Sequence, residues 1–458
     1  MDKIKKGLRK VQPVQIIALG FLVMILLGGA LLTLPVASAN GNSLGFINGL
    51  FTSTSAVCVT GLIAVDTGID FSVFGQIVII LLIQAGGLGF MTVTTMIFLL
   101  MRKRISLRER IIIRESLNEE SLSGMVKMIK RILLVTFISE LIGAISLSIR
   151  FIPLYGAAKG IYFSFFHAVS AFCNAGFDLI GGFRSLTPFA NDFLINVTIM
   201  ALIVVGGIGF VVILDIARKI KMGKAARLAL HSKIALIVTI GLIVFGAVAF
   251  YILENGNQNT IGSPALTPGG KALAAAFQSV TPRTAGFNTI DQNSLGSAAK
   301  LLTMILMFIG ASPAGTGGGI KTSTAAVIVL LVSSIVRGKR DVNVLGKRID
   351  TNVILRAIAI VMLAILLVLT VSLLLFITEK SDGVFTFENI MFEVFSAFGT
   401  VGLSTGISPL LSVLGKILIM LTMYGGRVGM LTLMLAVANR LNRDDSKIRY
   451  PEEKIIVG

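Results

Sequence analysis

Four short segments of this sequence share a pattern suited to the binding of a cation by backbone oxygens. Each begins at a phenylalanine, continues through small and apolar residues, and ends one residue after a glycine at position 61, 176, 286 or 402. Glycine reaches φ > 0 without a steric penalty, so a bend at each glycine can turn several carbonyl oxygens in one direction. Rings of such carbonyls replace the hydration shell of potassium. The pattern predicts a selectivity filter, with four ordinary turn glycines as the alternative.

The carbonyls expected to line this filter belong to each glycine and to the three residues before it. Because the four segments are similar and not identical, fourfold symmetry is expected to be approximate. The predicted filter segments, which hold K⁺ as a bound ion, are Cys58, Val59, Thr60 and Gly61, then Cys173, Asn174, Ala175 and Gly176, then Arg283, Thr284, Ala285 and Gly286, and finally Gly399, Thr400, Val401 and Gly402. The two cysteines are expected to be packed thiols, and a disulfide between them is the less favoured reading.

A glycine-rich segment, residues 310–321, interrupts one long apolar stretch. Five glycines and a proline within eleven residues cannot remain regular helix, since each glycine costs about 1 kcal/mol and a proline about 3. We expect this segment to bulge into the cavity beneath the filter, where it would act as a gate; a packing kink is the alternative. The predicted gate residues in it are Gly310, Ala311, Ser312, Pro313, Ala314, Gly315, Thr316, Gly317, Gly318, Gly319 and Lys321.

Three further polar residues lie within apolar stretches or filter segments. Arg427 lies in the middle of the last stretch, where a charge costs about 2.5–3.5 kcal/mol. It is therefore expected to face the aqueous cavity, to repel passing cations and to pair with carbonyls of the glycine-rich segment; a structural ion pair is the alternative. Glu140 lies in the third stretch, where it makes a structural hydrogen bond or binds a cation. His167 has no metal-ligand partner at helical spacing and is expected to be a packed histidine.

The elements that must position these residues are helices in a membrane. The chain has 458 residues, of which 55% are hydrophobic and 14% charged, and crossing a bilayer takes roughly 20 apolar residues. Eight stretches are long enough: Val14–Ala37, Phe74–Met101, Met128–Arg150, Phe193–Ala217, Lys233–Leu253, Ala298–Val336, Val353–Ile377 and Leu411–Ala438. Four shorter amphipathic runs precede the glycines: Gly45–Ala56, Gly160–Phe172, Gly270–Val280 and Phe385–Phe398. The pattern predicts an all-α membrane protein with eight transmembrane helices, arranged as four pseudo-symmetric helix–pore loop–helix repeats around one central pore.

The repeats are expected at residues 14–104, 105–220, 228–340 (with the gating insertion 310–321) and 350–440, flanked by a cytoplasmic segment 1–13 and a tail 441–458.

The net charge is +18, and the basic residues gather in alternate connections, with none between Lys10 and Arg102. This is the positive-inside asymmetry, which places both termini in the cytoplasm and the filter segments outside. It also argues against nucleic-acid binding. The basic loops Arg102–Arg114 and Arg218–Arg227 are either docking surfaces for a partner or contacts with anionic lipid.

The sequence resembles the Ktr/Trk/HKT superfamily of potassium transporters, and within it the bacterial Ktr-type membrane subunit. The residues that carry the resemblance are Thr-Gly-Leu at 60–62, Asn-Ala-Gly-Phe at 174–177, Val-Thr-Pro-Arg-Thr-Ala-Gly-Phe at 280–287 and Phe-Gly-Thr-Val-Gly-Leu at 398–403. Glycine at all four filter positions goes, in that superfamily, with potassium selectivity. The glycine-rich segment resembles the family's intramembrane gating loop, and the resemblance gives Arg427 a barrier role. The tail resembles the Ktr terminus, which packs at the dimer contact.

The resemblance also implies potassium uptake across the bacterial plasma membrane, with Na⁺ as an activating or coupled ion and without a covalent cofactor. The partners implied are a second copy of the chain, in a homodimer, and a cytosolic ring of nucleotide-binding regulatory subunits of the RCK/KTN type. A sodium-permeating or poorly selective monovalent cation channel is the alternative. An intramembrane enzyme is not expected, because the stretches contain no serine–histidine or paired-aspartate constellation.

Overall fold

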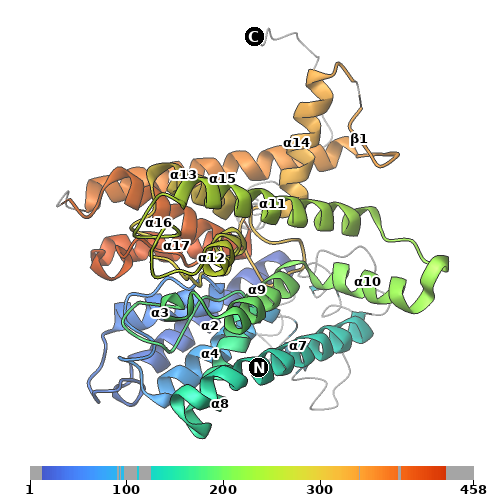
Figure 1. Cartoon of the computed structure of the whole chain (residues 1–458). Helices are drawn as coiled ribbons and strands as arrows, with labels where there is room; N and C mark the ends of the chain where they lie inside the picture. The colour runs from blue at the N-terminus through green and yellow to red at the C-terminus, as the bar shows by residue number, and fades with distance from the viewer. Residues whose placement is uncertain are drawn as a thin grey trace, which may run out of the picture.

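The structure is a computed structural model that describes residues 13–89, 92, 94–96, 111–112, 125–339, 341–379 and 383–429. Several expectations therefore lie outside the described residues. They are the positions of residues 1–12, the later parts of two predicted spans (90–101 in large part, and 430–438), nearly all of the basic loop Arg102–Arg114, and the tail 441–458. The described part is predominantly helical (Figure 1).

The helices fall into four groups along the chain. The first contains α2 (Pro13–Thr33), η1 (Pro35–Ala37), α3 (Phe46–Cys58) and α4 (Val73–Leu88). The second contains α7 (Met125–Tyr155), α8 (Ala157–Phe172), η2 (Thr187–Phe189), α9 (Phe193–Gly207), α10 (Phe210–Met222) and η3 (Gly223–Ala225). The third contains α11 (Leu230–Glu254), α12 (Pro268–Val280), α13 (Ser297–Phe308) and α14 (Thr322–Val336). An antiparallel hairpin of β1 (Asn343–Val344) and β2 (Lys347–Arg348) follows, and the fourth group contains α15 (Thr351–Thr378), α16 (Phe387–Gly399), η4 (Ser408–Leu410) and α17 (Val413–Val428).

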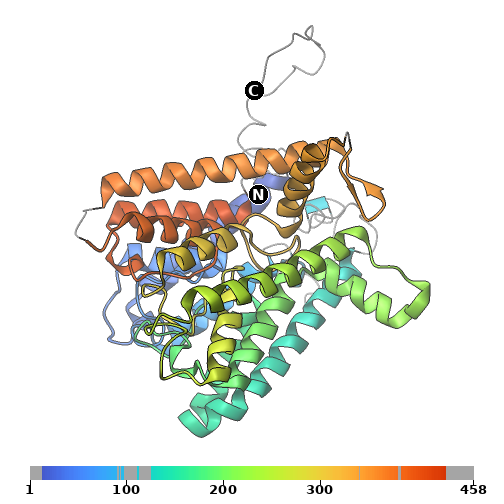
Figure 2. The same ribbon diagram turned by 45° about the horizontal axis from the view of Figure 1, so that its top comes forward.

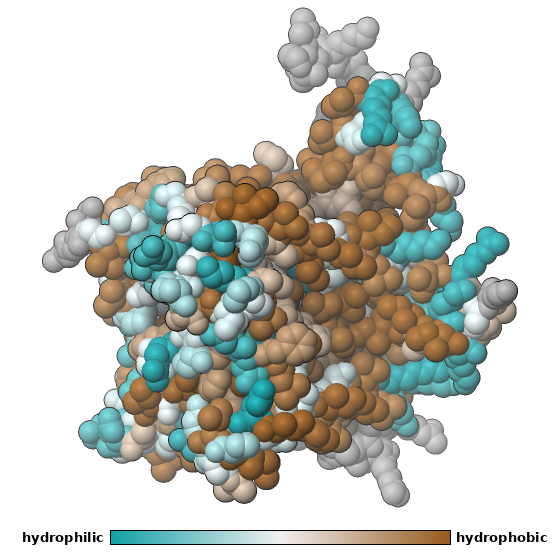
Figure 3. Space-filling model, in the orientation of Figure 1, coloured by the Kyte–Doolittle hydropathy of each residue, from teal (hydrophilic) through white to brown (hydrophobic). Residues whose placement is uncertain are grey.

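The long helices carry the composition of membrane spans. Among the described residues, α2, α7, α11 and α15 are long and apolar enough to cross a membrane, and α9 with α10 would make a fifth span if the bent pair is counted as one. Their outer faces expose large apolar side chains, such as Leu134, Phe137 and Leu141 on α7, which water would disfavour and lipid accepts. Hydrophobic residues cover the centre and right of the face in Figure 3, and hydrophilic residues gather in its left half and along its right edge. The protein is thus a multi-pass membrane protein.

Helices end inside the predicted spans of all four groups. Helix α4 ends at Leu88, before Gly89 with φ of +82°, and α17 ends at Val428, before Gly429 with φ of +92°. The stretch Phe193–Ala217 is bent by 97° between α9 and α10, which the sequence analysis did not foresee. The bend occurs at Gly209, whose φ of +94° ends a helix, and the next amide donates to the carbonyl of Ala314 at 2.9 Å. The stretch Ala298–Val336 is interrupted between Phe308 and Thr322, where the glycine-rich segment lies. A continuous helix over Phe193–Ala217 was therefore a wrong prediction, because a hydrogen bond to the glycine-rich segment replaces a helical one there. The interruption of Ala298–Val336 agrees with the expectation that residues 310–321 cannot remain regular helix.

The four short helices α3, α8, α12 and α16 form the centre of the molecule. Every residue of α3 from Phe51 to Cys58 and of α8 from Phe166 to Phe172 is buried, whereas the long helices bury only one stripe. Hydroxyl side chains begin several of the inner helices: Thr267 caps α12 and Thr386 caps α16 by accepting a backbone N–H one turn ahead. The short helices therefore end in the protein interior, where irregular backbone at membrane depth is tolerated.

Contacts between the groups close in a ring. Helix α4 packs on α8, α9 packs on α12, α13 packs on α16, and α17 packs on α3. Each of these contacts joins the helix that follows the short helix in one group to the short helix of the next group, and the fourth joins the last group to the first. Figures 1 and 2 show α17 beside α3 although more than 350 residues separate them.

Candidate cation site

The four predicted filter segments share an unusual backbone conformation. In each of them the glycine has φ > 0, and so does the residue two positions before it. The non-glycine members are Val59 (58°), Asn174 (60°), Thr284 (68°) and Thr400 (49°), and the glycines are Gly61 (92°), Gly176 (70°), Gly286 (81°) and Gly402 (93°). A left-handed β-branched residue costs of order 1–3 kcal/mol and persists only where its surroundings impose it. The repetition of this strain at equivalent positions indicates one shared geometry.

The four glycines stand around one point, each facing the next segment. A Cβ added to Gly61 would lie 2.5 Å from the carbonyl oxygen of Ala175, and one added to Gly176 would lie 2.8 Å from that of Ala285. A Cβ on Gly286 would meet the carbonyl oxygen of Val401, and one on Gly402 would meet that of Thr60, which closes the circuit. The structure therefore brings together all four predicted filter segments. Each filter glycine leaves room, where a side chain would stand, for the carbonyl oxygen of the residue before the next filter glycine.

Hydroxyl groups tie each filter segment to the short helix before it. The amides of Gly61 and Gly402 donate to the hydroxyls of Ser55 and Ser396, both at 3.0 Å. The hydroxyl of Ser170 donates to the carbonyl of Phe177 at 2.7 Å, and Thr281 makes the same bond to the residue after Gly286. These buried hydrogen bonds fix the position of each filter glycine, either through the amide of the glycine itself or through the carbonyl of the residue after it.

Glycines in the longer helices pack against the ends of the short helices. A Cβ on Gly86, Gly206 or Gly426 would collide with the carbonyl of the residue four positions before the filter glycine: Val57, Phe172 or Phe398. In three groups a longer helix can therefore approach the end of a short helix this closely only because it has glycine at the contact. In the third group, Gly310 faces Gly318 and Gly319 of the glycine-rich segment instead.

The glycine-rich segment lies directly against the filter segments. The amide of Gly318 donates to the Thr400 hydroxyl at 3.0 Å, and a Cβ on Gly317 would overlap the Thr284 side chain. The backbone of the glycine-rich segment is also bonded to the end of α9, since the amide of Ser312 donates to the carbonyl of Gly207 at 2.9 Å. Lys321 folds back and donates to the carbonyl of Gly317 at 2.7 Å.

Arg427 binds backbone carbonyls of two segments that are far apart in the chain. Its guanidinium donates to the carbonyls of Thr316 in the glycine-rich segment and Gly86 in α4, and at 3.3 Å to that of Gly87. No aspartate or glutamate among the described residues pairs with it, so the alternative of a structural ion pair has no partner in this part of the chain. The predicted contact between Arg427 and carbonyls of the glycine-rich segment is present.

The predicted polar residues beside the filter have separate surroundings. Both cysteines are free and buried, and the Cys173 thiol donates to Gln84 Oε1 at 3.4 Å. Glu140 is 3% exposed, and its Oε1 has no hydrogen-bond partner among the described residues. The structure therefore agrees with packed thiols and leaves both interpretations of Glu140 open.

Sequence reasoning missed three buried residues in the short helices. His167, which was expected only to pack, accepts the backbone amide of Leu179. Gln278 and Glu393 were not considered, yet each binds side chains of the outer segments, which we define as residues 62–72, 177–192, 287–296 and 403–412. The signal that could have found them is their position eight or nine residues before a filter glycine.

Aspartates on the outer segments differ in their roles. Asp66 is a structural carboxylate that accepts the amides of Gly68 at 2.9 Å and Phe183 at 3.0 Å. Asp178 lies outside the membrane-spanning helices, two residues after Gly176. Burial, and to a smaller extent the negative charge of Asp66, raises its pKa to about 6. Asp178 is therefore the outer carboxylate whose charge changes near neutral pH.

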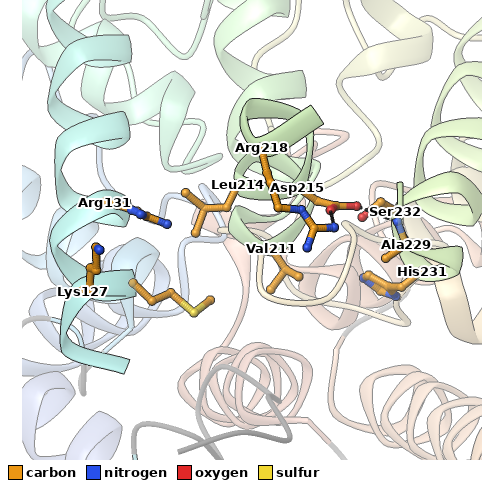
Figure 4. Close-up of a pocket in the computed structure, with 10 residues that line it drawn as sticks. Lys127, Arg131, Val211, Leu214, Asp215, Arg218, Ala229, His231 and Ser232 are labelled. Carbon is orange, nitrogen blue, oxygen red and sulfur yellow. Dashed lines mark hydrogen bonds and ion pairs between the residues drawn. The ribbon is translucent and has the colours of Figure 1, made fainter. Parts of the chain in front are cut away.

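A cavity of about 580 Å³ opens at the other end of the molecule, between α7, α10 and the start of α11 (Figure 4). Lys127 and Arg131 line it from α7, and Arg218 faces it from α10. Arg218 pairs with Asp215 at 2.6 Å, and Asp215 also accepts the amide of Ala229 at 2.8 Å. The first residue of the predicted basic loop Arg218–Arg227 thus lines the same cavity as two basic residues of α7.

Comparisons with known proteins identify a family. A family model described as TrkH, a cation transport protein, matches residues 9–448. The chain is 43% identical over 459 residues to the potassium/sodium uptake protein NtpJ of Enterococcus hirae, with both chains covered completely. It is 40% identical over 457 residues to the Ktr system potassium uptake protein B of Bacillus subtilis, covering 100% of this chain and 99% of that one.

The fold has a counterpart among solved structures. The crystal structure of the potassium transporter TrkH from Vibrio parahaemolyticus matches with a TM-score of 0.70 at 16% sequence identity, covering 93% of this chain and 86% of that chain. At 16% sequence identity this similarity is evidence for the fold alone.

Proposed function

Because the chain belongs to the TrkH family of cation transport proteins, we propose that it carries potassium into the cell through the ring of filter segments. The expectation that it is a transporter and not an enzyme is confirmed by the family and by relatives named for potassium uptake. Uptake would follow the membrane potential, since one charge crossing 100 mV gains about 2.3 kcal/mol, or roughly 50-fold accumulation.

The observation that carries the proposal is the closed circuit of four glycines, each facing the carbonyl before the next glycine. Carbonyl oxygens that converge from four directions can replace the water of a cation, and K⁺ would bind there. Strained backbone at every filter segment supports the same interpretation, because such strain is kept where it serves a site. On this proposal the four helix groups are four repeats around one pore, with the boundaries given by the sequence pattern.

The glycine-rich segment and Arg427 would form the gate below the filter. The segment touches Thr400 of one filter segment and lies against Thr284 of another, so its movement would open or block the path of the ion. Arg427 would hold it by the carbonyl of Thr316 while placing a positive charge in the way of cations.

The family resemblance supports four further parts of the proposal. They are sodium dependence, a homodimer, a cytosolic ring of nucleotide-binding regulatory subunits of the RCK/KTN type, and cytoplasmic termini in a bacterial plasma membrane. The basic residues around the cavity of Figure 4 suit the docking of such a partner. A sodium-permeating or poorly selective channel is a second candidate, favoured by a 43% identical relative that is named for both potassium and sodium uptake.

Growth rescue tests the proposal. A host that lacks its own potassium uptake systems should grow at low potassium when it expresses this chain with its partner, and added sodium should improve growth. Competition between rubidium and sodium in liposomes separates the two candidates, because a potassium filter excludes sodium. Equal uptake of both ions would favour the poorly selective channel, and an absence of rescue would contradict potassium uptake.

A further inference from the structure

We propose that three buried side chains of the short helices, His167, Gln278 and Glu393, bind the outer segments and thereby fix the filter glycines in place. They lie nine, eight and nine residues before Gly176, Gly286 and Gly402, and each is at most 1% exposed. The inference rests on the proposed function, because it concerns the same filter. It assigns a positioning role, since the three side chains act through the outer segments.

Glu393 of α16 binds the fourth outer segment through its carboxylate. The hydroxyl of Ser404 donates to Oε1 at 3.0 Å and Oε2 at 2.9 Å, the Ser408 hydroxyl donates to Oε1, and the Thr405 amide adds a backbone bond. Both carboxylate oxygens are thus engaged by the outer segment, through two hydroxyls and one backbone amide. Ser404 lies two residues after Gly402, so these bonds hold the chain immediately beyond the filter.

Gln278 of α12 binds the third outer segment through a reciprocal amide pair. Its Nε2 donates to Gln292 Oε1 at 2.9 Å, and Gln292 Nε2 donates back to Gln278 Oε1 at 3.0 Å. Gln292 also donates to the carbonyl of Ile290 at 2.9 Å. Two buried amides that satisfy each other fix the relative position of helix and segment, because either one alone would leave a buried polar group unpaired.

His167 of α8 binds the second outer segment through its ring. Its Nδ1 lies 2.7 Å from the carbonyl of Phe163, which can only accept, so Nδ1 carries the proton. The free lone pair of Nε2 then accepts the amide of Leu179 at 3.4 Å. The ring also packs against Phe287, with centroids 6.3 Å apart, and Phe287 follows the filter glycine of the next segment.

The first short helix provides an internal comparison. Thr52 of α3 lies nine residues before Gly61 and is equally buried, but its hydroxyl has no hydrogen-bond partner among the described residues. The outer segment there is held by its own carboxylates, since Asp70 Oδ2 accepts the amide of Asp66 at 2.9 Å. Thr52→Val is therefore a nearly isosteric control that removes a buried hydroxyl without removing a bond.

The test compares Glu393→Gln with Thr52→Val in the full-length protein, using two measurements. The first is the ratio of rubidium to sodium uptake in liposomes, which should fall about tenfold in Glu393→Gln, the order expected for losing one hydrogen bond to a charged group. The second is hydrogen–deuterium exchange in a peptide covering residues 403–412, which should become faster in Glu393→Gln. Thr52→Val should match the wild type in both.

Further variants keep the inference testable if Glu393→Gln does not fold or if the proposed function is wrong. If Glu393→Gln is poorly folded, Gln278→Met serves instead, with exchange followed in residues 287–296. Combining Glu393→Gln with Ser404→Ala should add little to the single change, because both remove the same bond. Unchanged exchange in 403–412 overturns the inference. If the wild type shows no preference for rubidium, the proposed filter fails, while the exchange measurement still decides whether Glu393 holds the outer segment.

Discussion

Replacing Gly402 with serine should damage ion selectivity by displacing the filter carbonyls. A Cβ at Gly402 would stand 2.9 Å from Cα of Gly61 and closer still to the carbonyl oxygen of Thr60. Ordinary contact begins at 3.4 Å, so by subtraction Gly61 must retreat by at least about half an ångström and the Thr60 carbonyl by more. The φ of +93° adds strain of about 1–3 kcal/mol for any residue with a side chain.

The expected result is a ten- to hundredfold loss of discrimination between rubidium and sodium, since misplacing one carbonyl of the ring forfeits about 1.4–3 kcal/mol. The assay is uptake of the two ions into liposomes containing purified protein. Gly45→Ser is the matched control: its φ is +86°, similar to that of Gly402, but nothing lies within 4 Å of its added Cβ. The comparison separates backbone strain from displacement of the carbonyl.

Two outcomes would refute this reasoning. If Gly402→Ser keeps the wild-type ratio of rubidium to sodium uptake, the carbonyls around Gly402 do not select the ion. If Gly45→Ser loses as much discrimination as Gly402→Ser, strain at any positive-φ glycine is sufficient and the ring is not special.

Three further changes test other parts of the site. Arg427→Ala should raise basal cation flux several-fold, because it removes both the positive charge and the bond to the Thr316 carbonyl; flux at the wild-type level in liposomes would leave Arg427 a packing residue. Deleting Ala311–Gly318 should raise flux measured without the regulatory partner, since it removes the contact with Thr400, and unchanged flux would make the segment a kink only. Asp178 has a raised pKa of about 6, so it is charged at pH 7 and neutral at pH 5; wild-type uptake at low potassium should therefore fall as the pH drops through 6, and Asp178→Asn should show a flat profile. The reason is that a negative charge beside the filter raises the local concentration of cations, and a wild-type profile without a step near pH 6 would contradict that role for Asp178.

Much of the candidate site could be read from the sequence because its geometry depends on local chemistry. A bend with φ > 0 needs glycine, so the filter glycines stand out as a repeated phrase. The glycine-rich segment was identifiable for a related reason, because glycine and proline end a helix wherever they cluster. By contrast, the bend at Gly209 was missed, since the glycines at 206, 207 and 209 lie in an otherwise apolar stretch that is compatible with a continuous helix until a neighbouring segment offers other hydrogen bonds.

Hydropathy, glycine chemistry and short motifs are properties of neighbouring residues, so the membrane class, the four filter phrases, the broken stretch and the family resemblance could be recognised without coordinates. Which groups meet depends on the folded chain: this holds for the order of contacts around the ring, the three side chains that bind the outer segments, and the Gly86 carbonyl bound by Arg427. Gly86 and Arg427 are 341 residues apart in the chain and touch in the fold. Contacts of that kind follow from the closing of the ring, which no local pattern records.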